Sequence, residues 1–93
     1  MSVEIGILPA GAWGTALAVP ASAGGNRVRL WRRAPGWARN WDRGHPALPG
    51  LRLPENVAAC DTPEAAVKGA DLVILSPSSA GLRAVCRLVR PHL

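Results

Sequence analysis

Short apolar runs recur along the chain, separated by turn signals and by segments of helical composition. Four of these runs are predicted as strands, at Val3 to Leu8, Arg27 to Trp31, Val57 to Cys60 and Asp71 to Ser76. The first is mostly apolar and the last is apolar throughout its centre, Leu72 to Leu75, which predicts burial on both faces of a parallel sheet. The third is short, as expected of an edge strand.

Two helices are marked by their end signals. Ala12 to Val19 is predicted as the first helix, and Pro20 falls where that helix should continue. A proline inside a helix costs about 3 kcal/mol because it removes a backbone bond and clashes with the preceding turn, so we expect the helix to end or kink there. The second helix is short and is bracketed by an N-cap, a first-position proline, a first-turn acid and a following glycine, namely Thr62, Pro63, Glu64 and Gly69.

A third helix has the most regular apolar stripe in the chain. Leu82, Val85, Cys86 and Val89 recur at the spacing i, i+3, i+4 and i+7, which predicts that they face the core. Pro91 then ends the helix. The residues that fall outside the stripe are Arg83, Arg87 and Arg90.

The alternation of strands and helices predicts an α/β fold. The 93 residues allow a single small domain, residues 1–93, with a parallel sheet of order 3-2-1-4 in a doubly wound, Rossmann-like arrangement. Residues 34 to 56 have no regular period and are predicted as a surface loop, with a helix around Trp37 to Asp42.

Composition and charge leave the function open. The chain is 48% apolar, as expected of a globular protein, and its ten arginines and one lysine against six acids give a net charge of +5. This charge suits phosphate-bearing ligands or non-specific nucleic-acid contact. It is equally explained by a GC-rich coding sequence. The arginines are dispersed without a binding motif, so no specific nucleic-acid partner is expected.

The chain offers no pattern for a metal, a disulfide or a membrane segment. Cys60 and Cys86 are far apart and are predicted as small buried hydrophobes. His45 and His92 lack acidic or cysteine partners at useful spacing, so neither a metal site nor a catalytic triad is predicted. We expect a cytoplasmic protein with no membrane partner, because there is neither a signal sequence nor a run long enough to cross a bilayer.

The most informative feature is the turn from the first strand into the first helix. Unpaired N–H groups in a first helical turn, together with the helix dipole, favour a pyrophosphate. The dinucleotide pattern G-x-G-x-x-G keeps its second and third glycines here, as Gly11 and Gly14, while Pro9 occupies the first position. Pro9 fixes φ and supplies no donor. The alternative is a tight turn that only packs on the sheet.

Residues Gly11 to Ala18 resemble the opening of NAD(P)-dependent glycerol-3-phosphate dehydrogenases. Further matches follow in the family's order, at Val28 to Arg33, Leu48 to Pro54, Ala70 to Leu75, Pro77 to Ser78, Leu82 to Val85 and Arg90 to Leu93. The resemblance covers nearly the whole chain. It implies the first part of the family's cofactor-binding domain, lacking the later strands and the C-terminal helical domain.

The resemblance assigns the phosphate turn to Gly11, Ala12, Trp13 and Gly14, with the Trp13 side chain flanking the cofactor. By composition alone, a tryptophan at this position is more often a core residue. Ser78, after the fourth strand, either lines the nicotinamide side or caps the next helix.

The cofactor is predicted to be NADP(H) rather than NAD(H). Folds that prefer NAD place a carboxylate after the second strand, whereas this chain has Arg32 and Arg33 there. Guanidinium groups bind phosphate in a bidentate manner, which suits a 2′-phosphate. The alternative is two solvated arginines on a loop.

Members of the family reduce dihydroxyacetone phosphate by hydride transfer, with a lysine in the proton transfer. The family's catalytic lysines lie beyond this chain, so the resemblance implies an oxidoreductase of which these 93 residues alone are inactive. The alternatives are a non-enzymatic nucleotide- or partner-binding module and, less favoured, a basic nucleic-acid binder. The strand Asp71 to Ser76, left at the sheet edge, is expected to promote self-association.

Overall fold

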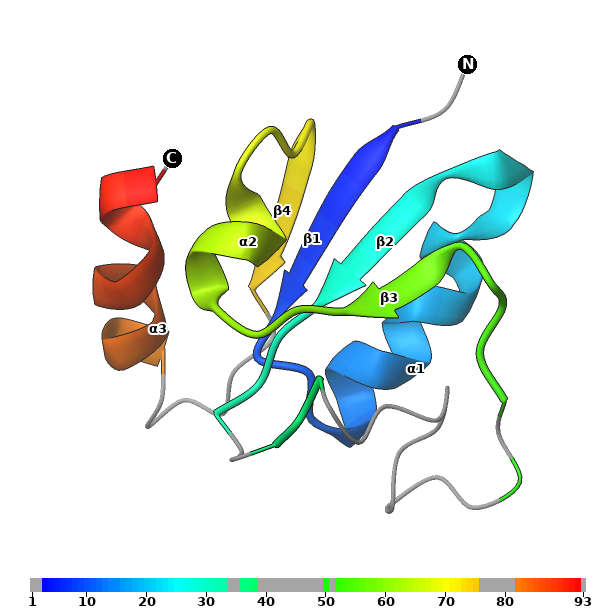
Figure 1. The fold of residues 1–93 in the computed structure, drawn as a ribbon, viewed down its shortest axis with the longest axis horizontal. Coiled ribbons are helices and arrows are strands. Elements are labelled where there is room, and N and C mark those ends of the chain that lie inside the picture. Colours follow the sequence, from blue (N-terminus) through cyan, green and yellow to red (C-terminus); the bar gives the residue numbers. More distant parts are fainter. Residues whose placement is uncertain (1–2, 34–35, 39–49, 51, 76–81, 93) are drawn as a thin grey trace.

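A computed structural model describes residues 3–33, 36–38, 50, 52–75 and 82–92 (Figure 1). The strands are β1 (Glu4–Leu8), β2 (Arg27–Leu30), β3 (Val57–Ala59) and β4 (Leu72–Leu75). The helices are α1 (Ala12–Ala21), α2 (Pro63–Val67) and α3 (Leu82–Val89), with short 3-10 helices at Ala23–Gly25 and Arg90–His92. Of the helix expected near Trp37 to Asp42, only Trp37 and Ala38 are described, and they lie in a turn.

The four strands form one parallel sheet in the order β3-β2-β1-β4, which confirms the predicted fold class and strand order. Ile5 of β1 pairs with Val28 of β2 on one side and with Leu72 of β4 on the other. Val28 pairs in turn with Val57 of β3. Because all pairs are parallel, the four carboxyl ends lie at the same edge of the sheet (Figure 1).

Helices lie on both faces of the sheet, with α1 on one face and α2 on the other, and α3 packs beside α2 (Figure 1). The α1 side buries Ile5, Ile7, Ala18, Val28, Leu30 and Val57, and the α2 side buries Leu8, Trp31, Ala66, Val67 and Val89. In β1 every residue from Ile5 to Leu8 is buried, which confirms that this strand is covered on both faces.

Gly6 in β1 allows α2 to lie directly on the sheet. A Cβ atom built on Gly6 would come within 2.2 Å of the Ala66 carbonyl oxygen, which belongs to the backbone of α2. The helix itself is held as predicted, since the Thr62 hydroxyl accepts a hydrogen bond of 3.1 Å from the Ala65 N–H and Pro63 is its first residue. Gly69, just after the helix, has a φ of +71°.

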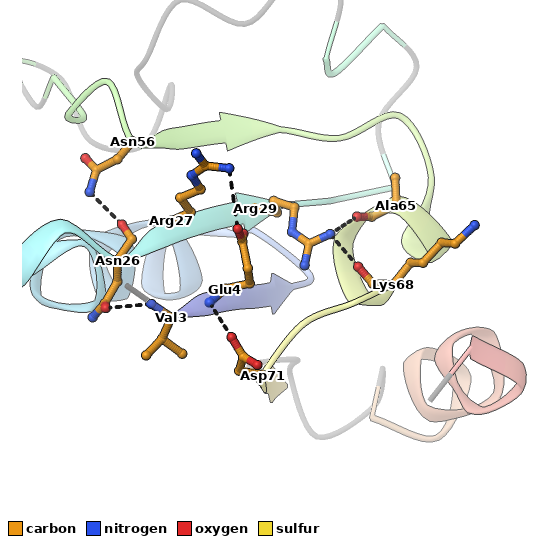
Figure 2. A network of polar contacts seen from close by, with 9 residues as sticks. All are labelled: Val3, Glu4, Asn26, Arg27, Arg29, Asn56, Ala65, Lys68 and Asp71. Atoms are coloured by element: carbon orange, nitrogen blue, oxygen red, sulfur yellow. Dashed lines mark hydrogen bonds and ion pairs between the residues drawn. The ribbon is translucent and has the colours of Figure 1, made fainter. Parts of the chain in front are cut away.

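Polar contacts join the amino ends of the strands (Figure 2). The Asp71 carboxylate accepts from the Glu4 N–H at 2.9 Å, and the Asp71 N–H donates to the Glu4 carbonyl at 2.7 Å. Asn26 accepts from the Val3 N–H at 3.1 Å, and Asn56 donates to the Asn26 carbonyl at 2.6 Å. These bonds fix where β1, β2, β3 and β4 begin relative to one another.

Two burial predictions were wrong. β4 is not covered on both faces: Leu72 is 50% exposed, and the other three residues of the strand are half-buried. The reason is that β4 is an edge strand, paired with β1 alone among the described strands. Cys86 is exposed and Cys60 is half-buried, whereas both were expected in the core. In α3, Leu88 rather than Cys86 packs beside Val89 against the α2 side.

The first helix is longer than predicted. α1 ends at Ala21, so Pro20 lies within its last turn. A proline there removes the bond of its own N–H and crowds the carbonyl of the preceding turn, and the helix runs only one residue past it. The Ser22 N–H still donates to the Ala18 carbonyl at 2.9 Å, and this bond closes the helix around Pro20.

Candidate functional site

Backbone hydrogen bonds join the loop after β1 to the segment after β2. The Ala10 N–H donates to the Trp31 carbonyl at 2.7 Å, and the Trp31 N–H donates to the Ile7 carbonyl at 3.3 Å. Both bonds lie at the carboxyl edge of the sheet, beside β1, where the direction of strand order changes. Open α/β sheets bind their ligands at this position. The glycine turn and the Arg32 segment are therefore neighbours at the ligand-binding edge.

The first turn of α1 presents three N–H groups that find no acceptor in the part of the chain that the structure describes. Gly11 is the N-cap residue, in extended conformation, and no side chain caps the helix. The first bond of the helix runs from the Thr15 N–H to the Gly11 carbonyl at 2.9 Å. The preceding N–H groups, of Ala12, Trp13 and Gly14, have no acceptor among the described residues. Together with the helix dipole they form a site suited to an anion.

Nothing within the described fold requires a glycine at position 11. Its φ of −74° is open to any residue, and a Cβ built on it would meet no atom within 4 Å. The space beside the Gly11 backbone is therefore open, which fits the close approach of a pyrophosphate to the N–H groups. Pro9, in the first position of the glycine pattern, is half-buried and follows a cis peptide bond.

Trp13 lies at the surface beside this anion site. Its exposed fraction is 71%, so the interpretation of Trp13 as a core residue is wrong. Gly14, one residue further along α1, is buried. A large apolar side chain exposed at the start of α1 fits the role of flanking a bound ligand.

The two arginines after β2 have different surroundings. The guanidinium of Arg32 lies over the ring of Trp37, with its carbon 5.6 Å from the ring centroid, and the residue is half-buried. Arg33 is exposed. The alternative of two solvated arginines therefore does not describe Arg32. Ser78 lies outside the described residues.

Arg29 is a structural residue that the sequence analysis missed. It reaches from β2 to the end of α2, where its Nη1 donates to the Ala65 carbonyl at 2.8 Å and to the Lys68 carbonyl at 2.7 Å (Figure 2). A cation at a helix C-terminus is favourable because it meets the negative end of the dipole. The hint in the sequence was a basic residue at the centre of the predicted strand Arg27 to Trp31.

Cys60 follows β3 and packs on the α2 side of the sheet. Burial raises the pKa of its thiol, which outweighs the lowering effect of the nearby Arg29 charge. A thiol of this kind is less reactive at neutral pH, so Cys60 has a packing role.

The described segments hold neither a metal-binding cluster nor a helix that could span a membrane. Within them, no three His, Cys, Asp or Glu side chains gather closely enough to hold a metal ion. Among the described helices, none has the length and apolar character needed to cross a membrane.

Comparison with known proteins agrees with this geometry. Residues 4–93 match the family model described as NAD-dependent glycerol-3-phosphate dehydrogenase N-terminus. The chain is 77% identical over 91 residues to the NAD(P)+ glycerol-3-phosphate dehydrogenase of Symbiobacterium thermophilum, and 44% identical over 96 residues to that of Moorella thermoacetica. These alignments cover 98% and 100% of this chain but 27% and 29% of the relatives. The chain thus spans less than a third of their length. No solved structure matches the chain.

Proposed function

The chain belongs to the family of the NAD-dependent glycerol-3-phosphate dehydrogenase N-terminus, and from that premise we propose that it binds a nicotinamide dinucleotide at the carboxyl edge of its sheet. The N–H groups of Ala12, Trp13 and Gly14 would hold the pyrophosphate at the start of α1. Trp13 would cover one side of the bound dinucleotide.

The observation that carries this proposal is the open space at Gly11. Glycine is retained in proteins where the backbone turns left-handed or where another group comes close. Gly11 has a φ of −74°, and a Cβ there would contact nothing in the described fold. A ligand approaching the backbone explains the glycine, and the unpaired N–H groups beside it indicate that this ligand is an anion.

We propose further that the cofactor is NADP(H) in preference to NAD(H). Arg32 and Arg33 supply positive charge at the end of β2, and residues 31 to 33 contain no carboxylate for a ribose 2′-hydroxyl. The bond from Ala10 to the Trp31 carbonyl supports this arrangement, because it holds the Arg32 segment beside the phosphate turn.

The reaction proposed for the whole protein is that of its relatives, the interconversion of dihydroxyacetone phosphate and sn-glycerol 3-phosphate. The nicotinamide supplies the hydride when it is bound. The residues of this chain bind and orient the cofactor, and none of them matches a catalytic lysine of the family. The 93-residue polypeptide alone is therefore expected to show no oxidation of NADPH with dihydroxyacetone phosphate.

Gly11→Ala tests the cofactor site. The added methyl group would occupy the space proposed for the pyrophosphate, so the dissociation constants for NADPH and NADH should both rise at least about tenfold, which corresponds to roughly 1.4 kcal/mol of binding free energy. Stability should stay the same or rise slightly, since alanine fits the observed φ. Calorimetric titration measures the first effect and a thermal melt the second. Unchanged affinity for both cofactors would refute the proposed site.

A further inference from the structure

We propose that Trp37 is a positioning residue that fixes the Arg32 guanidinium to receive the 2′-phosphate of NADPH. This inference rests on the proposed cofactor site and assigns different roles to two neighbouring arginines. Arg32 is the residue that distinguishes the two cofactors, and Arg33 contributes only general positive charge.

The Trp37 ring is anchored at the end of β2. Its Nε1–H donates to the Leu30 carbonyl at 3.3 Å, and its half-buried ring packs against the core on the α1 side of the sheet. The same carbonyl accepts from the Cys60 N–H at 2.7 Å, so it is itself held between β2 and the residue after β3. The ring therefore has a fixed place relative to the carboxyl edge of the sheet.

Arg32 lies over the face of this anchored ring, at 5.6 Å from its centroid. A guanidinium so placed is attracted to the electron-rich face of the indole. This contact involves the positive charge of the guanidinium and the face of the ring, whereas the N–H groups of a guanidinium lie in its own plane. Those in-plane donors are the ones that bind phosphate in a bidentate manner.

The position of Arg32 along the chain brings it next to the anion site. Trp31, the preceding residue, accepts a hydrogen bond from Ala10 at 2.7 Å, and Ala10 directly precedes the N-cap residue Gly11. A dinucleotide with its pyrophosphate at α1 thus has its adenosine ribose near Arg32. Arg33 is exposed, and its side chain makes no hydrogen bond, ion pair or ring contact with the described residues.

Ordering Arg32 before the cofactor arrives favours NADPH specifically. An arginine side chain loses much rotamer freedom when it binds a phosphate, and a side chain that is already stacked loses less. Only NADPH carries the 2′-phosphate, so this gain appears in the ratio of the two affinities and not in the affinity for NADH. A purely structural role of Trp37 would change both affinities alike.

The test uses the natural protein that carries this sequence and measures dissociation constants for NADPH and NADH by calorimetric titration. We expect Trp37→Leu to weaken NADPH binding by about five- to thirtyfold, the range of a partly desolvated cation–π contact, and NADH binding by less than about twofold. Trp37→Phe keeps an aromatic face under Arg32 and should stay within about threefold of the parent protein for both cofactors.

A matched pair of arginine variants keeps the inference testable even if Trp37→Leu fails to fold. Arg32→Ala should abolish the preference for NADPH, whereas Arg33→Ala should lower it by about threefold or less. Equal losses for both cofactors in Trp37→Leu, or a larger loss of preference in Arg33→Ala than in Arg32→Ala, would overturn the inference while leaving the cofactor site intact. Failure of the parent protein to bind either cofactor would refute the proposed function itself and the inference with it.

Discussion

Replacing Gly6 with alanine should be among the most damaging single-methyl additions that this fold can receive. The methyl carbon would lie 2.2 Å from the Ala66 carbonyl oxygen and 3.1 Å from its carbonyl carbon. Ordinary contact begins at about 3.4 Å, so α2 would have to move away from β1 by roughly 1.2 Å. The obstacle is helix backbone, which cannot rotate aside as a flexible side chain would.

The cost follows from what holds α2 in place. Ala66 and Val67 are 0% and 3% exposed, so a shift of this size opens a gap beneath both. It would also stretch the Arg29 bonds to the Ala65 and Lys68 carbonyls, now 2.8 and 2.7 Å. Adding a methylene to a packed core typically costs 1–3 kcal/mol, and we expect about 3–4 kcal/mol here because backbone must move. For a domain of 60–100 residues that loss lowers the melting temperature by roughly 12 to 30 °C, and for a protein of 150–250 residues by roughly 6 to 16 °C.

Thermal unfolding followed by circular dichroism measures this effect, in the natural protein that carries the sequence. Gly11→Ala is the matched control, since the same added methyl group meets nothing within 4 Å at a φ of −74°. Its melting temperature should equal or slightly exceed that of the parent. A Gly6→Ala protein that melts within about 3 °C of the parent would refute the close packing of α2 on β1.

Three other predictions follow from the described contacts. Arg29→Met should lower the free energy of unfolding by about 1–2 kcal/mol, because it removes two partly exposed hydrogen bonds to α2. Arg27→Met breaks only the exposed 3.5 Å ion pair with Glu4 and should lower it by less than about 0.5 kcal/mol. Denaturant titration measures both values, and equal losses would contradict the role given to Arg29. Iodoacetamide at pH 8 should alkylate the exposed Cys86 before Cys60, because burial raises the pKa of the Cys60 thiol and leaves less of it as thiolate. Mass spectrometry identifies the modified residue, and modification of Cys60 first would contradict this prediction. Leu72→Glu should reduce self-association of the chain, because Leu72 is a half-exposed residue on edge strand β4. Sedimentation measures the distribution of monomers and oligomers. The same distribution for the variant and the parent, whether associated or purely monomeric, would rule out this edge as the contact.

The ends of α2 were predictable because their signals are local, and the strand order was predictable because alternating strands and helices favour a doubly wound sheet. Thr62, Pro63 and Gly69 each act within one turn of the helix that they bracket. The exposure of Cys86 was not predictable in the same way. On α3 both Cys86 and Leu88 adjoin the line from Val85 to Val89, and the position of α2 decides which of the two is covered.

The candidate site shows the same division between local and distant causes. The glycine turn, the exposed start of α1 and the arginines after β2 follow from consecutive residues, so the sequence located them. The role of Trp37 depends on the Leu30 carbonyl, and that of Arg29 on helix carbonyls 36 and 39 residues away. A glycine is needed at position 6 because the Ala66 backbone occupies the space of a side chain, and no pattern around β1 indicates this contact.

The bond from the Ala10 N–H to the Trp31 carbonyl has a consequence for how cofactor choice can change. It sets a fixed spacing between the proposed pyrophosphate site, where every nicotinamide dinucleotide is alike, and the proposed site of the adenosine ribose, where two of them differ. The bond uses main-chain atoms only, so side chains after Trp31 can be exchanged without altering that spacing. Evolution can therefore switch the cofactor by substitutions in a few residues after β2 while the start of α1 stays the same.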